Sequence, residues 1–388
     1  MTLAAHPTSQ SGIALMPEQS ALEANTPIVA DFTRSIPPMP PIFRARLSAS
    51  LSELAADPHL DMLVRTSASG GKPSDRAAGL KWLEPKLGDQ IATGRMTVTN
   101  GTQGAVLLLL EALVGQNGLL LAEALSWGAL REIARRAHVR IKGLPIDDDG
   151  IIPDAFEAAC RDLHPKALYC NPTDQNPTTA IMSETRRRQI AEIARRYGVA
   201  IIEDDALGRL HPGSPAPIAS IAPDITWYVM GLTKCVAQGL RLAYVVGPSE
   251  ADTQQVIGPA RKLSFWAPNP LTTAIASGWI NNGTAEEICT AIHNESTKRE
   301  ELASSLLSGA DLVSKPGAMH VWLRLPSEQD RHQLTASLKD KGVAVRPAEL
   351  FAVDDTPVPN AVRLSLSSPL DRSQVEQGLR LIATALNL

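Results

Sequence analysis

The chain has 388 residues, of which 44% are hydrophobic, and a formal net charge of -4. This length and apolar content are typical of a globular protein with two or more domains and sizeable cores. The slight acidity gives no sign of a nucleic-acid or membrane partner, since either would favour a basic face. The longest apolar runs, Val106–Leu110 and Leu119–Ala122, stop at glutamates and fall far short of the roughly 20 residues that a bilayer span needs.

The N-terminal region lacks the basic segment and apolar stretch of a signal peptide. Residues 1–27 are rich in Ala, Ser and Pro, and we expect them to form a loosely ordered arm. The cysteines show neither CxxC nor zinc-type spacing, which indicates no metal site and favours reduced, buried thiols in a cytoplasmic protein. They are Cys160, Cys170, Cys235 and Cys289.

Short apolar runs alternate with helical patterns from about residue 97 to residue 250. Ser183–Tyr197 has apolar residues at helical spacing, with Ser183 as the expected N-cap. The alternation predicts an α/β domain with a largely parallel sheet. The expected strands are Leu119–Glu123, Ala167–Asn171, Val199–Asp204, Thr226–Met230 and Leu242–Val246.

The pattern changes after the prolines at 268 and 270. A helical stretch from about Leu271 to Leu307 is followed by expected strands at His320–Leu325, near Val343–Arg346 and at Val362–Leu366, and by a terminal helix. This order predicts a second, smaller α+β domain.

Polar residues follow several of the expected strands, and parallel sheets bind ligands outside the carboxyl ends of their strands. These residues are Asn-Pro-Thr-Asp-Gln-Asn-Pro-Thr at 171–178, Glu-Asp-Asp at 203–205, and Gly-Leu-Thr-Lys at 231–234 with Gly-Leu-Arg at 239–241. The turn Thr-Asn-Gly-Thr-Gln-Gly at 99–104 opens a helix, whose first N–H groups suit a phosphate. Lys234 alone is equally consistent with a solvated turn, but the polar residues at the other strand ends favour a binding site.

In this order and spacing, the motifs resemble those of the class I/II aminotransferases, which use pyridoxal 5′-phosphate (PLP). The closer resemblance is to the aminotransferase-like domain of GntR-type (MocR-like) regulators and its stand-alone relatives. It runs from about Ile28 to the C-terminus and also rests on Asp75–Gly79, Trp82-Leu83, Pro316–Leu323 and Val362–Leu364. The resemblance implies fold type I, with a mostly parallel sheet in a large PLP-binding domain (61–268). It also implies a small domain built from residues 28–60 and 269–388.

The resemblance implies a role for each matching residue. Lys234 would carry PLP as a Schiff base and act as the general base. Asp204 would keep the pyridine nitrogen protonated, and Asn176 would hydrogen-bond the ring O3′ and help to bind substrate. The implied phosphate ligands are Gly101, Thr102, Gln103, Thr233 and Arg241.

Two further implied residues, Trp127 and Arg363, would stack on the ring and bind the substrate α-carboxylate, respectively. Each of these assignments has an alternative. Trp127 is also consistent with a core residue, Gln103 with a helix cap, and Arg363 with an outward-facing strand residue.

The sequence departs from the family at two positions. Leu207 stands where relatives commonly have a tyrosine that donates to O3′, and Thr66 where a tyrosine usually reaches the neighbouring subunit's cofactor phosphate. Both substitutions leave the Schiff base and the electron-accepting ring intact. They nevertheless keep elimination, cyclisation or oxidation of an amino acid open beside transamination.

The leading expectation is an aminotransferase that moves an amino group between an α-amino acid and a 2-oxo acid. It would act as a homodimer with shared active sites and bind neither nucleic acid nor membranes. A non-catalytic PLP sensor is the remaining alternative. It is disfavoured because the roughly thirty residues before the resemblance show no helical periodicity or basic cluster typical of a DNA-binding domain.

Overall fold

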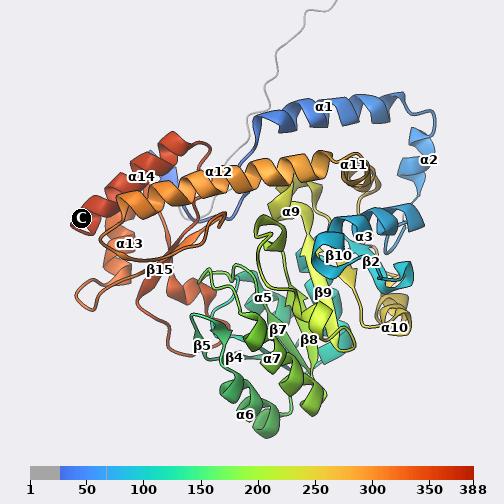
Figure 1. Ribbon diagram of the computed structural model, residues 1–388, viewed down its shortest axis with the longest axis horizontal. Helices are drawn as coiled ribbons and strands as arrows, with labels where there is room; N and C mark the ends of the chain where they lie inside the picture. The colour runs from blue at the N-terminus through green and yellow to red at the C-terminus, as the bar shows by residue number, and fades with distance from the viewer. Residues whose placement is uncertain (1–26, 67) are drawn as a thin grey trace, which may run out of the picture.

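A seven-stranded sheet forms the centre of the computed structural model (Figure 1). The structure describes residues 27–66 and 68–388, so the expected N-terminal arm lies outside the described residues apart from Pro27. In spatial order the strands are β2 (Met96–Thr99), β10 (Ala243–Val246), β9 (Thr226–Gly231), β8 (Ala200–Asp204), β7 (Ala167–Cys170), β3 (Leu119–Glu123) and β4 (Arg140–Leu144). β10 is antiparallel to both of its neighbours, whereas the other pairs are parallel. The expected largely parallel sheet is confirmed.

All five strands expected in this domain are present, and each of their ends lies within one residue of the prediction. The prediction misses β2 and β4. β4 pairs only with β3 among the described residues, and its Arg140 and Lys142 are exposed. An edge strand with charged residues on its open side lacks the apolar run that marks the buried strands.

Alternate residues of each strand point to opposite faces of the sheet. On β3, Leu120 and Ala122 pack towards the face covered by α4, α5 and α10. Leu119 and Leu121 face α6 and α7 instead. The helices are α4 (Thr102–Leu109), α5 (Ala129–Arg136), α10 (Glu250–Ala260), α6 (Pro153–Leu163) and α7 (Glu184–Tyr197). Because helices cover both faces, the central strands are apolar over most of their length.

The helix expected at 183–197 is present as α7. The Ser183 hydroxyl accepts a hydrogen bond from the Arg186 N–H at 3.3 Å, as an N-cap does. Gly198 ends the helix with a φ of 67°, a conformation in which a side chain would be strained. Local capping therefore fixes both ends of the helix that leads into β8.

A second sheet of four strands lies towards the left in Figure 1. Its order is β11 (Asp311–Val313), β12 (Val321–Arg324), β15 (Ala361–Leu364) and β14 (Arg346–Pro347). The helices α13 (Arg331–Asp340) and α14 (Arg372–Ala385) share its apolar core. The strands expected at His320–Leu325 and Val362–Leu366 and the terminal helix are thus confirmed. The single strand expected near Val343–Arg346 is divided in two, because β13 (Val343–Ala344) belongs to a separate sheet and only β14 joins this one. The domain boundaries stay a prediction.

The helical stretch expected at 271–307 is two helices, α11 (Pro270–Asn281) and α12 (Thr284–Leu306). The prediction of a continuous stretch is wrong at this point, because Gly283 has a φ of 85° and breaks the helix. Ile280, Ala285 and Ile288 all join one core cluster across the break. Apolar spacing therefore continues through the turn and hides it from the sequence.

The N-terminal segment of the described chain joins the second sheet region through β1 (Ala30–Asp31), which pairs in parallel with β13 (Val343–Ala344). Beyond it α1 (Pro41–Ala56) packs near α12, as Figure 1 shows at the top, and α2 (Leu60–Arg65) and α3 (Pro73–Leu87) follow. The remaining short elements are β5 (Ile146–Asp147), β6 (Gly150–Ile151), α8 (Ile218–Ile221) and α9 (Leu232–Cys235). Among the described residues, no helix has the length and hydropathy to cross a bilayer.

Candidate active site

A cavity of about 210 Å³ opens at the carboxyl ends of β7, β8 and β9. Nine of the ten residues that the resemblance assigned to the site line it, namely Gly101, Thr102, Gln103, Trp127, Asn176, Asp204, Thr233, Lys234 and Arg241. The tenth, Arg363, lines an adjoining cavity together with Asn176 and Trp127. The structure therefore brings the predicted residues into one place, as the strand-end argument expects. Their chemical roles stay predictions.

Asp204 ends β8 in a fully buried position. Its Oδ2 accepts a hydrogen bond from the Tyr169 hydroxyl at 2.7 Å, and its Oδ1 accepts one from the Ala206 N–H at 3.1 Å. Burial raises the pKa of Asp204 to about 6, although these hydrogen bonds act in the opposite direction. A carboxylate that is costly to ionise in this way is well suited to a cationic partner, which would lower its pKa again.

Lys234 lies in α9, directly after the buried strand β9. Its Nζ donates to the backbone carbonyl of Ser35, which comes from the segment after β1. Burial, reinforced by the charge of Arg363, lowers the pKa of Lys234 to about 8, and Asp204 opposes this shift. The amine therefore loses its proton more readily than an exposed lysine and is better able to act as a nucleophile or base.

The turn before α4 forms an anion cradle with the loop that follows Lys234. Gly101 has a φ of 112°, and no side chain of the described residues caps the first N–H groups of α4. The buried Thr102 hydroxyl has no hydrogen-bond partner among the described residues. A Cβ on Gly231 would lie 2.6 Å from that hydroxyl oxygen, so a glycine is needed where β9 passes it. Free N–H groups at a helix start and an unpaired hydroxyl suit a phosphate.

Arg363 is buried on β15 and reaches the site from the second sheet. Its Nη1 donates to Asn176 Oδ1 at 2.9 Å and its Nη2 to the Thr33 carbonyl at 2.6 Å. The guanidinium lies 4.8 Å from the centre of the Phe351 ring. It does not face outward, so the alternative of an outward-facing strand residue is wrong.

Trp127 is half-buried and lines both cavities, and its Nε1 has no hydrogen-bond partner in the described part of the chain. Gln103 is exposed at the rim of the site cavity, and its side chain does not cap α4.

The two positions that depart from the family differ in place. Leu207 is buried and lines the site cavity. Thr66 lies outside that cavity, and its hydroxyl donates to the carbonyls of Met62 and Leu63.

Several residues around the cavity were not assigned from the sequence. Tyr169 holds Asp204 from the middle of β7. The Asn171 side chain donates to the Asp204 carbonyl at 2.8 Å, and Asp174, which also lines the cavity, lies 3.1 Å from His211 Nε2. Tyr169 pairs in register with Ile202 on β8. Because side chains alternate along a strand, residue 204 is on the same face as residue 202, and a contact between Tyr169 and Asp204 could be expected from this register.

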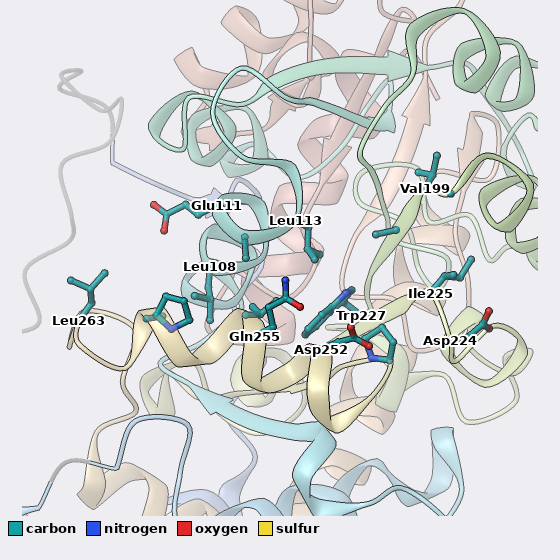
Figure 2. A pocket seen from close by; sticks show the side chains of 17 residues that line it. Leu108, Glu111, Leu113, Val199, Asp224, Ile225, Trp227, Asp252, Gln255 and Leu263 are labelled. Carbon is teal, nitrogen blue, oxygen red and sulfur yellow. The ribbon is translucent and has the colours of Figure 1, made fainter.

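A second cavity, of about 750 Å³, lies at the opposite edge of the sheet (Figure 2). Val199 and Ile225, just before β8 and β9, line it together with Gln255 of α10 and Trp227. None of the residues expected in the site lies there. The polar strand-end motifs gather at one edge of the sheet only.

The donor set of the smaller cavity fits PLP. The α4 start, Thr102, Thr233 and Arg241 would hold its phosphate. Asp204 would pair with the pyridine nitrogen, Asn176 with O3′ and Lys234 with the aldehyde carbon. The fit rests on groups that lack protein partners or are costly to bury alone, such as the Thr102 hydroxyl and the Asp204 carboxylate.

Known proteins share both the sequence pattern and the fold. The chain is 27% identical over 300 residues to an uncharacterised HTH-type transcriptional regulator (YdeF) of Bacillus subtilis, covering 77% of this chain and 64% of the relative. It thus spans less than two thirds of that relative. It is 23% identical over 367 residues to aromatic-amino-acid aminotransferase 1 of Thermococcus litoralis, covering 90% of this chain and 86% of the relative.

A solved structure of Pyrococcus horikoshii kynurenine aminotransferase matches with a TM-score of 0.83 and 22% identity, covering 94% of this chain and 91% of the other. This likeness establishes the fold and confirms the expected fold type I. The sequence profile of the family described as aminotransferase class I and II matches residues 67–382, well over half of the chain. The chain therefore belongs to the class I and II aminotransferase family.

Proposed function

We propose that the chain is a PLP-dependent aminotransferase that moves an amino group between an α-amino acid and a 2-oxo acid. One observation carries the proposal. The Lys234 amine, with its pKa lowered to about 8, and the buried Asp204 carboxylate line one cavity beside an anion cradle. Family membership and the aminotransferases among the relatives support the same reaction.

Bound PLP supplies an electron-accepting ring that makes the Cα proton of an attached amino acid acidic. Lys234 would hold the cofactor and would act as the general base that takes and returns protons beside it. Its lowered pKa leaves part of the amine unprotonated near neutral pH. Asp204 would hold the proton on the pyridine nitrogen, and Arg363 would fix the substrate α-carboxylate.

A panel of amino acids, incubated with the PLP-loaded protein and a 2-oxo acid acceptor, tests the proposal. We expect one new 2-oxo acid and one new amino acid for each molecule of donor amino acid consumed. Release of free ammonia without amination of the acceptor would contradict transamination.

The second candidate is elimination, cyclisation or oxidation of an amino acid on the same cofactor. The observation that favours it is Leu207, which gives the cavity wall an apolar side chain where a hydroxyl donor stands in relatives. The ammonia measurement separates the two candidates. A purely sensory role would leave PLP binding intact and give no turnover with any amino acid of the panel.

We also propose a homodimer with shared active sites. Arg241 and Gln103 are exposed at the rim of the site cavity, and Met62, Val64 and Phe265 are exposed apolar side chains. A partner subunit would cover such groups. Sedimentation analysis should give twice the mass of the chain.

A cytoplasmic location is part of the same proposal, without nucleic-acid or membrane partners. It is supported by four free, buried cysteines and the slightly acidic net charge of -4. Fractionation of the native cell is the corresponding test.

A further inference from the structure

A cavity of about 390 Å³ adjoins the site cavity and shares Ser35, Trp127 and Asn176 with it. It is the space that Arg363 faces, and Arg346 lines it as well. Leu350 and Phe351 supply an apolar wall. Under the proposed function, a substrate whose α-carboxylate meets Arg363 would extend its side chain into this space.

Arg346 and Arg363 are directly opposite each other on the antiparallel strands β14 and β15. Like charges in this arrangement destabilise a sheet. Burial and the charge of Arg346 lower the pKa of Arg363 to about 9. Two adjacent cations therefore lower the stability of this part of the sheet, although Asp31 partly opposes the effect on Arg363, and an anionic ligand would offset it.

Arg346 is half-buried, yet its side chain makes no hydrogen bond or ion pair within residues 27–66 and 68–388. Asp31 is near enough to raise its pKa, but burial prevails and the pKa is lowered. The Asp31 Oδ1 is already occupied by the N–H and the hydroxyl of Thr33, at 2.7 and 2.6 Å. An unpaired, partly buried guanidinium that faces a cavity is available to an external carboxylate.

The N-terminus of α5 opens onto the same cavity through Gly128 and Ala129. Among the described residues no side chain caps this helix. The Leu130 N–H donates to the Trp127 carbonyl at 3.0 Å, and the positive end of the helix dipole remains directed at the cavity, where it favours an anion. A Cβ on Gly128 would lie 3.9 Å from Arg346 Nη1. The guanidinium and the helix start therefore lie close together, with the Leu350 carbonyl oxygen 3.0 Å from the same Cβ position.

We propose that Arg346 and the N-terminus of α5 form a second carboxylate subsite, which selects dicarboxylic amino acids and the matching 2-oxo diacids. The inference rests on the proposed function, because Arg363 takes the α-carboxylate. Arg346 and Arg363 are opposite each other and line the same cavity, so a short diacid held there would place one carboxylate on each guanidinium. Leu350 and Phe351 would pack against its methylene groups.

Calorimetric binding of two five-carbon acids to the PLP-loaded protein tests the subsite without turnover. Glutarate carries two carboxylates and pentanoate carries one. The wild type should bind glutarate more tightly than pentanoate. Arg346→Gln should weaken glutarate binding by about 10- to 100-fold, the value of one charge-assisted hydrogen bond, and change pentanoate binding less than about threefold.

Arg131→Gln is the matched control, because Arg131 lies on α5 but pairs with Asp355 at 3.0 Å outside both cavities. It should change neither affinity. Arg363→Gln should weaken both acids, and Arg346→Lys, which keeps the charge, should lose less glutarate affinity than Arg346→Gln. The melting temperature of each variant shows that it is folded.

Equal loss of both acids in Arg346→Gln, or loss of neither, would overturn the subsite, as would a wild type that prefers pentanoate or binds neither acid. Failure of the aminotransferase proposal appears differently. In that case the affinities would follow the expected pattern, while no amino acid of the panel would donate its amino group.

Discussion

Two cavities lie at opposite edges of the seven-stranded sheet. The second cavity, a groove at the amino ends of β8 and β9, measures about 750 Å³ (Figure 2). Its lining includes Trp227, Val256 and Leu263. The cavity at the carboxyl ends measures about 210 Å³, and its walls hold Lys234, Asp204 and Arg241. The smaller space has the groups that chemistry requires, so residue content locates the site better than size does.

The two edges also differ in the charges that the fold buries. At the carboxyl edge, burial raises the pKa of Glu123 to about 8, of Glu203 to about 7 and of Asp204 to about 6. Glu111 and Gln255 at the groove are exposed. Buried ionisable groups lower stability unless they are paired, and they gather where function requires them.

The largest expected effect separates the two cavities by activity. Lys234→Ala should lower the aminotransfer rate by at least about 10²- to 10⁴-fold, the usual value of a general base. Gln255→Ala in the groove should leave the rate unchanged, because its exposed side chain lies at the other edge of the sheet. Steady-state rates with the best amino acid of the panel provide the measurement. A Gln255 variant as slow as the Lys234 variant would show that the groove also contributes to activity.

The next effect concerns substrate affinity at the site cavity. Arg363→Ala should weaken amino-acid binding by roughly 2–5 kcal/mol, as expected when one partner of a desolvated charge pair is removed. PLP content should stay near normal, because Arg363 lies in the adjoining cavity. Titration of the bound-cofactor absorbance with amino acid measures both. Unchanged affinity would mean that another group holds the α-carboxylate.

Much of this site is predictable because its residues follow buried strands. Asp204 and Lys234 stand at or just beyond the ends of β8 and β9, which the apolar runs mark clearly. The contacts that were missed depend on long-range pairing. Thr33 and Ser35 reach the site because the preceding strand β1 pairs with β13. This pairing involves only two residues of each strand, too few to produce a recognisable pattern in the sequence.

Arg346 shows a different limit of the sequence. It was expected only as the last residue of a strand, and the structure puts it opposite Arg363 on β14. Which strand pairs with which, and in what register, depends on the packing of the whole second sheet. A charged residue in an otherwise apolar strand was the available signal.

A pH experiment sharpens the contrast between the buried and exposed edges. Glu123 is neutral in the folded chain up to about pH 8, whereas it ionises in the unfolded chain above about pH 4.5. Its burial therefore favours unfolding increasingly as the pH rises through this interval. The uncharged Glu123→Gln variant lacks this effect, so its stability relative to wild type should rise by about 2–4 kcal/mol between pH 5 and pH 8.5.

Urea unfolding at the two pH values measures this difference. The same exchange in the groove, Glu111→Gln, should change stability by less than about 0.5 kcal/mol at either pH. A Glu123 variant whose relative stability does not depend on pH would show that the buried carboxyl group titrates normally.

The smallest effect probes the apolar wall at Leu207. A tyrosine there would donate a hydrogen bond to the cofactor O3′ and stabilise its negative charge, so the proton shared with the Lys234 nitrogen would be held less tightly. Such a bond contributes roughly 1.5–3 kcal/mol. Leu207→Tyr should therefore move the pH midpoint of the cofactor absorption change down by about one to two pH units. An equal or higher midpoint would mean that another donor already serves O3′.

The central claim is that Lys234 carries the cofactor, and borohydride reduction tests it most directly. Reduction fixes PLP to its lysine, and mass spectrometry of the digested protein then locates the adduct. We predict the added mass on the peptide that contains Lys234, with none on Lys86 or Lys262, which lie outside the site cavity. An adduct on any other lysine, or none in a protein that binds PLP, would contradict the account.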